Sequence, residues 1–269
     1  MSRQSRATGG KKFMSNIAQA FKNGKAFIGF VTGGDPHIEK TKEFVLEMFR
    51  AGADMVEIGI PFSDPIAEGP VIQEANIRAL SAGTTVEKLF TLVEDIRTAT
   101  NKPLAFMTYL NPVFHYGYEA FFKRARAAGL DGIIIPDLPH EEQGEVRKAA
   151  SEYGVDLISL IAPTSEARIR EIARDASGFI YLVSSMGVTG VRGEITTDLA
   201  SIVTAIRDVT AVPVAIGFGI HTPAQAAQMA RVADGVIVGS AIVKIIAEYG
   251  SEAGPHVYQY VKEMTKNLR

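Results

Sequence analysis

The sequence contains no cysteine, no long apolar run and no marked excess of charge of one sign. Without cysteine the chain cannot form disulfides, thiolate nucleophiles or Cys-ligated zinc sites, and this composition fits a reducing compartment such as the cytoplasm. No run approaches the roughly 18 apolar residues that a transmembrane helix needs. The formal net charge of −2 offers no bulk attraction to nucleic acid or to an anionic membrane, so we expect neither as a partner.

The N-terminal segment, residues 1–13, is polar and basic and lacks the apolar core of a secretory signal. Met14 opens a more helix-like segment. Beyond it there is no linker, charge block or low-complexity stretch. We therefore expect residues 1–13 to be a disordered extension and residues 14–269 to form one catalytic domain.

Short apolar segments alternate with longer amphipathic ones along this domain. Their shortness and continuous apolar character are typical of parallel strands covered on both faces. Eight such units predict an α/β fold, a single (β/α)8 TIM barrel with extra short helices, one of them at the N-terminus. A doubly wound open sheet is the alternative, disfavoured because no G-x-G-x-x-G follows the first strand. The expected strands are Phe27–Thr32, Met55–Ile60, Leu104–Tyr109, Gly132–Ile135, Leu157–Ile161, Phe179–Ser184, Val214–Gly217 and Gly235–Val238.

Helical periodicity is clearest in Ile38–Ala51 and Leu199–Val209, where apolar residues recur on one stripe. Several such segments end at a glycine, namely Gly52, Gly129 and Gly154. Glycine readily takes the positive φ that terminates a helix. These signals predict helices between the strands.

The second expected strand carries an unusual acid, Glu57. Side chains alternate between the faces of a strand, so if Val56 and Ile58 pack on the helices, Glu57 and Gly59 face the barrel interior. Desolvation there should raise the pKa of the carboxyl and suit it to proton transfer near neutrality. The alternative is a structural glutamate that is hydrogen-bonded inside the barrel.

The loop after this strand, residues 61–70, contains three prolines and two acids, Asp64 and Glu68. The prolines restrict the loop, so a carboxylate on it could be held in a defined direction. A solvated turn in which the acids or Ser63 only cap the backbone is the alternative, and the loop's composition alone favours it.

Glycine clusters follow the last three expected strands, at residues 187–193, 217–219 and 239. Glycine lets backbone N–H groups approach an anion, and the helix that begins near Ser240 would point its N-terminus at the same rim. Barrels often bind phosphate after strands seven and eight. Glycines after strands can also be simple turns, but three clusters together favour a phosphate site.

Other site chemistries find little support. The five histidines show no metal-ligand spacing, so no metal is expected. No lysine ends a strand: Lys102 precedes the third, and Lys244 falls in a helix. A Schiff-base mechanism is therefore disfavoured, and any carbon–carbon cleavage would have to use acid–base chemistry alone.

Eight motifs occur in order along the chain: Phe30–Pro36, Val56–Pro70, Tyr109–Pro112, Pro136–Pro139, Tyr181–Ser184, Gly187–Gly190, Gly217–Ile220 and Gly239–Lys244. Through them the chain resembles the tryptophan synthase alpha chain family over nearly everything after Met14. This resemblance implies a cofactor-free retro-aldol cleavage of indole-3-glycerol phosphate to indole and glyceraldehyde 3-phosphate. It also implies a beta chain as partner, in an α2β2 complex that receives the indole.

The resemblance also implies residue roles. Glu57 matches the catalytic glutamate that shuttles the proton, and Glu68 matches the second catalytic carboxylate, which hydrogen-bonds the indole N–H. Tyr181 matches the tyrosine that contacts the glutamate and the substrate. The implied substrate-binding residues are Phe30, Tyr109 and Phe218 at the indole, Gly190, Gly219, Gly239 and Ser240 at the phosphate, and Thr189 on a closing loop.

The chain departs from the family pattern in three places. Many members carry aspartate at the position of Glu68, residues 185–186 replace a more polar pair, and residues 1–13 have no counterpart. The extra methylene of a glutamate moves its charge by about 1.5 Å. A shift of about 1 Å can cost on the order of 100-fold in rate, so the efficiency of Glu68 depends on its surroundings.

Two other functions are compatible with the sequence. A free-standing indole-3-glycerol phosphate lyase would use the same residues without a beta chain. A catalytically silent phosphate-binding subunit would need neither Glu57, Glu68 nor Tyr181, and their presence argues against it.

Overall fold

The computed structural model describes residues 16–184, 198–217 and 219–268, and within these ranges parallel strands close into a barrel. Each strand pairs with the next in chain order, and β8 returns to β1. The predicted barrel is confirmed and the open sheet is excluded. The strands are β1 (Ala26–Thr32), β2 (Met55–Gly59), β3 (Leu104–Met107), β4 (Gly132–Ile134), β5 (Asp156–Ile161), β6 (Ile180–Val183), β7 (Val214–Gly217) and β8 (Gly235–Val238).

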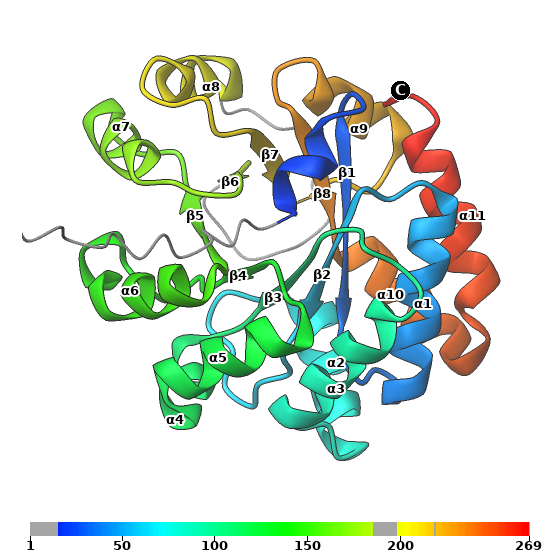
Figure 1. The fold of residues 1–269 in the computed structure, drawn as a ribbon. Coiled ribbons are helices and arrows are strands. Elements are labelled where there is room, and N and C mark those ends of the chain that lie inside the picture. Colours follow the sequence, from blue (N-terminus) through cyan, green and yellow to red (C-terminus); the bar gives the residue numbers. More distant parts are fainter. Residues whose placement is uncertain (1–15, 185–197, 218, 269) are drawn as a thin grey trace, which may run out of the picture.

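Helices surround the strands, and the first long helix lies beside the last one (Figure 1). None in the described ranges is long and apolar enough to cross a bilayer. The α-helices are α1 (Ile38–Ala51), α2 (Pro70–Ser81), α3 (Val86–Arg97), α4 (Leu110–Tyr116), α5 (Tyr118–Ala128), α6 (Gly144–Tyr153), α7 (Glu166–Arg174), α8 (Leu199–Arg207), α9 (Pro223–Ala230), α10 (Ser240–Tyr249) and α11 (Gly254–Thr265). Short 3-10 helices are η1 (Ile17–Phe21), η2 (His140–Glu142) and η3 (Gly250–Glu252).

The helix ends follow the glycine signals. Gly52, Gly129 and Gly154 adopt φ values of 112°, 85° and 67°, and each donates its N–H to a carbonyl of the preceding turn. A side chain at these positive φ values would be strained, so glycine ends the helix at little cost. The expected N-terminal helix is the 3-10 turn η1, and α10 begins directly after β8 as predicted.

Two apolar layers build the core. Ile28, Met55 and Ile134 belong to a cluster inside the barrel, to which Ile17 of η1 adds from the N-terminal end. The side chains that alternate with them, among them Val31 and Val56, pack outward against the helices. Since the two sets alternate along each strand, the interior position of Glu57 follows from its neighbours.

Aspartates that precede strands tie the N-terminal end of the barrel together. The Asp54 carboxylate accepts from Phe27 N–H at 2.9 Å, that of Asp131 from Leu104 N–H at 3.0 Å and that of Asp234 from Val214 N–H at 2.9 Å. Each bond joins the beginnings of two adjacent strands. It satisfies a backbone donor that would otherwise be buried without a partner.

Candidate active site

The side chain of Glu57 lies inside the barrel, between Phe30 on β1 and Ala105 on β3 in the strand register. It is fully buried, and neither carboxyl oxygen hydrogen-bonds any described residue. Burial raises its pKa from 4.5 to about 8. The prediction of an interior carboxyl is confirmed, and the described residues give Glu57 none of the hydrogen bonds expected of a purely structural glutamate. A carboxyl poised near neutral pH can both give and take a proton.

Tyr181 of β6 is the aromatic partner of this acid. Burial raises the pKa of its phenol well above the ordinary value, and the nearby charge of Glu57 raises it further. The ring fits because β7 has a glycine beneath it: a Cβ on Gly217 would lie 2.4 Å from the tyrosine hydroxyl. Tyr181 therefore stays a neutral phenol beside Glu57.

Phe30 of β1 occupies its place in a similar way. A Cβ on Gly59 would lie 2.8 Å from the end of its ring, and one on Gly239 would lie 3.3 Å from its edge. Two glycines, Gly59 in β2 and Gly239 directly after β8, thus leave space for the ring of Phe30. The ring forms an apolar wall beside the Glu57 carboxyl.

Glu68 lies two residues before α2, and the structure separates it from Asp64 of the same loop. Asp64 is exposed and accepts a hydrogen bond from its neighbour Ser63, as expected of a solvated turn. Glu68 instead accepts from Asn76 Nδ2 at 2.7 Å. Burial raises the pKa of Glu68, and the amide of Asn76 partly offsets the rise. The solvated turn therefore describes Asp64 and not Glu68.

Tyr109, which lies two residues after the end of β3, contacts the same loop. Its hydroxyl accepts from Ala67 N–H at 3.0 Å, and its ring lies 5.3 Å from that of Phe62. Burial raises the pKa of Tyr109 to about 12, so the phenol stays protonated. Tyr109 thus both lines the site and holds the backbone next to Glu68.

A cavity of about 430 Å³ collects these residues at the C-terminal ends of the strands. This is the end at which barrel enzymes carry their active sites. The predicted site residues that line it are Phe30, Glu57, Glu68, Tyr109, Tyr181, Gly219, Gly239 and Ser240. The predicted residues Thr189, Gly190 and Phe218 lie outside the described residues.

One end of the cavity has the geometry of an anion site. Ser240 is the first residue of α10, and the first N–H groups of a helix have no partner within it. Gly219, with φ of 78°, turns the backbone beside this helix start. Free N–H groups and the helix dipole together favour a phosphate here.

The sequence argument did not identify two residues that line the cavity, His221 and Lys244, or Asn76, which bonds the cavity residue Glu68. The sequence marks Asn76 only weakly, by its place in the helix that begins two residues after Glu68. Lys244 lies one turn after Ser240, on the helix that opens at the anion site, and that spacing could have marked it. His221, whose ring nitrogen lies 2.9 Å from the carbonyl oxygen of Gly219, is placed only by the fold.

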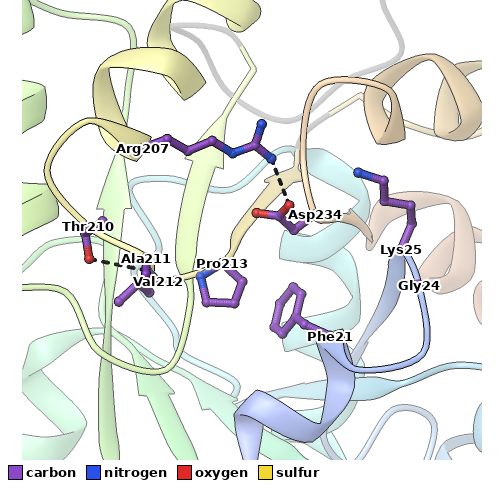
Figure 2. A pocket seen from close by; sticks show the side chains of 9 residues that line it. All are labelled: Phe21, Gly24, Lys25, Arg207, Thr210, Ala211, Val212, Pro213 and Asp234. Carbon is purple, nitrogen blue, oxygen red and sulfur yellow. Dashed lines mark hydrogen bonds and ion pairs between the residues drawn. The ribbon is translucent and has the colours of Figure 1, made fainter.

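A second cavity, of about 700 Å³, opens at the opposite end of the barrel (Figure 2). Its charged side chains are engaged in structural bonds. Arg207 pairs with Asp234 at 2.8 Å, and Lys25 donates to a backbone carbonyl at 2.7 Å. Its lining residues precede β1, β7 and β8, and Glu57, Glu68 and Tyr181 are not among them.

Comparisons with known proteins show which family this chain resembles in sequence and in fold. A family model described as tryptophan synthase alpha chain matches residues 17–268. A relative from Lactiplantibacillus plantarum with that name is 52% identical over 256 residues, 95% of this chain and 97% of the relative. Tryptophan synthase from Mycobacterium tuberculosis superposes with a TM-score of 0.87 at 34% identity, covering 96% of this chain and 99% of that one. The a2b2 complex from Pyrococcus furiosus, described for its mutual activation, gives 0.80 at 35% identity, with 90% and 98% covered.

Proposed function

The chain belongs to the tryptophan synthase alpha chain family, and from this premise we propose that Glu57, Glu68 and Tyr181 perform its catalysis. The family cleaves indole-3-glycerol phosphate, so the chain is a lyase of tryptophan biosynthesis. The observation that carries the proposal is a fully buried carboxyl, that of Glu57, with a pKa of about 8 and no hydrogen-bond partner among the described residues.

In this mechanism Glu57 transfers protons at two points of the substrate. Its acid form protonates C3 of the indole ring, which makes the ring an electron sink. Loss of the proton from the adjacent glycerol hydroxyl then breaks the bond between C3 and that carbon. The electron pair returns to the ring, and the hydroxyl becomes the aldehyde of glyceraldehyde 3-phosphate. Tyr181 beside Glu57 contacts both acid and substrate.

Glu68 supplies the second carboxylate, at the indole N–H. Positive charge develops on this nitrogen when C3 is protonated, and a fixed negative group stabilises it in the transition state. The two acids have different surroundings, since Glu57 has no described partner and Glu68 accepts from Asn76. Carboxyls whose pKa values are tuned apart can divide acid–base and electrostatic roles, and the scheme needs no cofactor.

The substrate lies with its ring between Phe30 and Tyr109 and its phosphate at Gly219, Gly239 and Ser240. The backbone turn at Gly219 and the start of α10 support this orientation. From the resemblance we also assign Gly190 to the phosphate, Phe218 to the indole and Thr189 to a loop that closes on the site.

We propose a beta chain as the partner, bound over the catalytic rim. Ile66 in the loop before α2 and Phe114 in α4 are 74% and 68% exposed on elements that follow β2 and β3. Large apolar side chains that protrude beside an active site suit a protein interface. A partner at this place could close the site and receive the indole.

The test is indole release from indole-3-glycerol phosphate by the purified chain, with and without the beta chain from the same source. We expect roughly 30- to 150-fold activation at saturating substrate, which corresponds to a shift of about 2–3 kcal/mol in a closing equilibrium. Full activity alone with no response to the beta chain would support a free-standing lyase. No turnover in either state would support a silent subunit.

Two further proposals concern the whole chain. We assign residues 14–269 to one catalytic domain and residues 1–13 to an extension, supported by the family match over residues 17–268. We also propose a cytoplasmic location, which fractionation of the source cells would test.

A further inference from the structure

The role proposed for Glu68, an acid at the indole nitrogen, requires that its carboxylate point in a defined direction, yet Glu68 lies on an irregular loop. Its carboxylate has one hydrogen bond to the described residues, from Asn76 Nδ2 to Oε2 at 2.7 Å. Oε1 has none among them, and the side chain lines the cavity. One oxygen is therefore held, and the other is available to a ligand.

The donor sits on a helix that is itself fixed. Asn76 is only 4% exposed within α2. Two residues later, Arg78 binds the buried carboxylate of Asp35 through two hydrogen bonds of 2.8 Å. Ile72 and Ala75 of the same helix join a buried cluster with Phe30 at the cavity wall. The amide thus has a defined place relative to the cavity.

We propose that Asn76 is a positioning residue for catalysis: its amide fixes one oxygen of Glu68 so that the other meets the indole N–H. The inference rests on the proposed role of Glu68. It also explains how a glutamate serves where a shorter acid would carry its oxygens about 1.5 Å less far. The length of the Glu68 side chain therefore fits the position of the Asn76 amide.

A neutral donor suits this task better than a cation. An amide N–H favours the ionised carboxylate, as its lowering effect on the pKa of Glu68 indicates, without cancelling the negative charge. An arginine or lysine here would neutralise the charge that the developing cation needs. Among the described residues, the other titratable groups that line the cavity are Glu57, Tyr109, Tyr181, His221, Lys244, Glu248 and Tyr260.

The experiment compares Asn76→Ala and Asn76→Asp with Glu68→Gln and the native chain, in the presence of the beta chain. We expect both Asn76 variants to lower kcat roughly 10- to 100-fold, the range expected for a lost hydrogen bond to a charged group or a displacement near 1 Å. KM should change less than about 3-fold, because the phosphate and ring contacts remain. The acidic limb of the kcat profile should move to higher pH, because without the donor Glu68 ionises less readily.

Gln73→Ala is the matched control. Gln73 lies on the same helix and donates to Glu68 as well, but to its backbone carbonyl, at 2.8 Å. If the carboxyl is what must be aimed, this variant keeps kcat within about 3-fold, the scale of a weak exposed hydrogen bond. A loss equal to that of Asn76→Ala would mean that α2 only holds the loop, which overturns the inference.

Moving one methylene group from the side chain at position 68 to the side chain at position 76 tests the pairing of Glu68 with Asn76 independently. Glu68→Asp shortens the acid, and adding Asn76→Gln extends the amide by the same methylene. The double variant E68D/N76Q should recover at least about 3-fold of the kcat lost by E68D, because the bond can form again. Purely additive losses would contradict a paired arrangement.

The outcomes separate the inference from the function on which it rests. Unchanged kcat in Glu68→Gln would refute the role of Glu68, and the positioning role with it. A large loss in Glu68→Gln with native kcat in both Asn76 variants would overturn the positioning role alone. Circular dichroism and thermal melts identify any variant that fails to fold. If Asn76→Ala does not fold, Asn76→Asp, whose side chain has the size of asparagine, provides the kcat comparison.

Discussion

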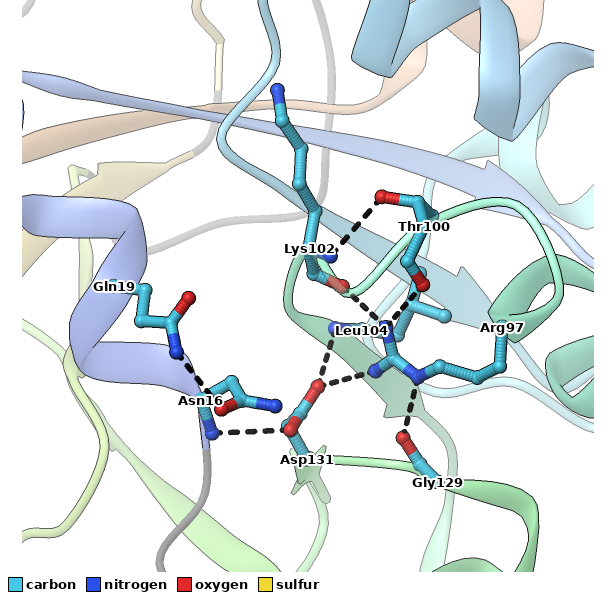
Figure 3. Close-up of polar contacts among 8 residues, drawn as sticks. All are labelled: Asn16, Gln19, Arg97, Thr100, Lys102, Leu104, Gly129 and Asp131. Carbon is cyan, nitrogen blue, oxygen red and sulfur yellow. Dashed lines mark hydrogen bonds and ion pairs between the residues drawn. The ribbon is translucent and has the colours of Figure 1, made fainter.

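The two ends of the barrel treat a buried carboxyl in opposite ways. At the N-terminal end, Asp131 accepts from the N–H groups of Asn16 and Leu104 at 3.1 and 3.0 Å and pairs with Arg97 (Figure 3). At the C-terminal end, both oxygens of Glu57 are buried without a partner among the described residues. The first arrangement stabilises the fold. The second costs stability and leaves a carboxyl free for chemistry.

The residues around Asp131 show how a buried carboxylate is supplied with hydrogen-bond and ion-pair partners. Arg97 also donates to the carbonyl oxygens of Gly129 and Lys102, so its guanidinium bridges the segments before β3 and β4. Burial lowers the pKa of Arg97, and the charge of Asp131 acts against this. The pair holds two strand beginnings together. In barrels this end serves stability and the opposite end serves function.

The sharpest way to test the contrast is Glu57→Gln. Glutamine keeps the shape and loses the proton, so kcat should fall by about 100- to 10,000-fold, the range of general acid–base catalysis. KM should stay within a few-fold, and the melting temperature should not fall. Indole release and a thermal melt measure both. Retention of more than about one-tenth of kcat would show that Glu57 is not the proton shuttle.

Asp131→Ala should have the opposite signature. It leaves the largely buried guanidinium of Arg97 without its carboxylate and two backbone N–H groups without their acceptor. We expect a loss of about 3–5 kcal/mol in the free energy of unfolding, with kcat of the folded enzyme unchanged. Urea unfolding measures the loss. Asp208→Ala, which breaks an exposed pair with Arg170, is the control and should cost less than about 1 kcal/mol.

The pH dependence of stability provides a third test. The Glu57 carboxyl ionises near 4.5 when unfolded but near 8 when folded, so between these values the folded state holds a proton that the unfolded state has released. Stability contributed by this group therefore falls as pH rises from about 4.5 to 8. Relative to the native chain, Glu57→Gln should gain on the order of 3 kcal/mol between pH 4.5 and 7. A pH-independent difference in urea midpoint would contradict the raised pKa.

Ser240→Asp should give the smallest of these effects. It should raise the free energy of unfolding slightly while it weakens substrate binding at the C-terminal end of the barrel. A carboxylate at the start of α10 suits the helix dipole, worth about 0.3–1 kcal/mol, but repels the substrate phosphate. We expect KM to rise at least about 10-fold, and Ser240→Asn, of equal size and no charge, to raise it far less. Equal KM values for the two variants would place the phosphate elsewhere.

Local sequence patterns predicted most of the fold and part of the candidate site. The eight apolar segments, the helices and the glycine ends came from periods and backbone preferences that neighbouring residues specify. Strand alternation also placed Glu57 inside, because Val56 and Ile58 on either side belong outside. The resemblance named Glu68 but could not show what holds it.

The sequence by itself determined the order of the strands and helices and the inward direction of Glu57, because each depends on residues a few positions apart. Only the tertiary structure decided that His221 and Lys244 line the same cavity as Glu57, and that Asp131 has hydrogen-bond partners while Glu57 has none among the described residues. Hydrogen bonding and burial depend on which distant segments meet. Barrel closure brings those segments together, and no local period of the sequence encodes them.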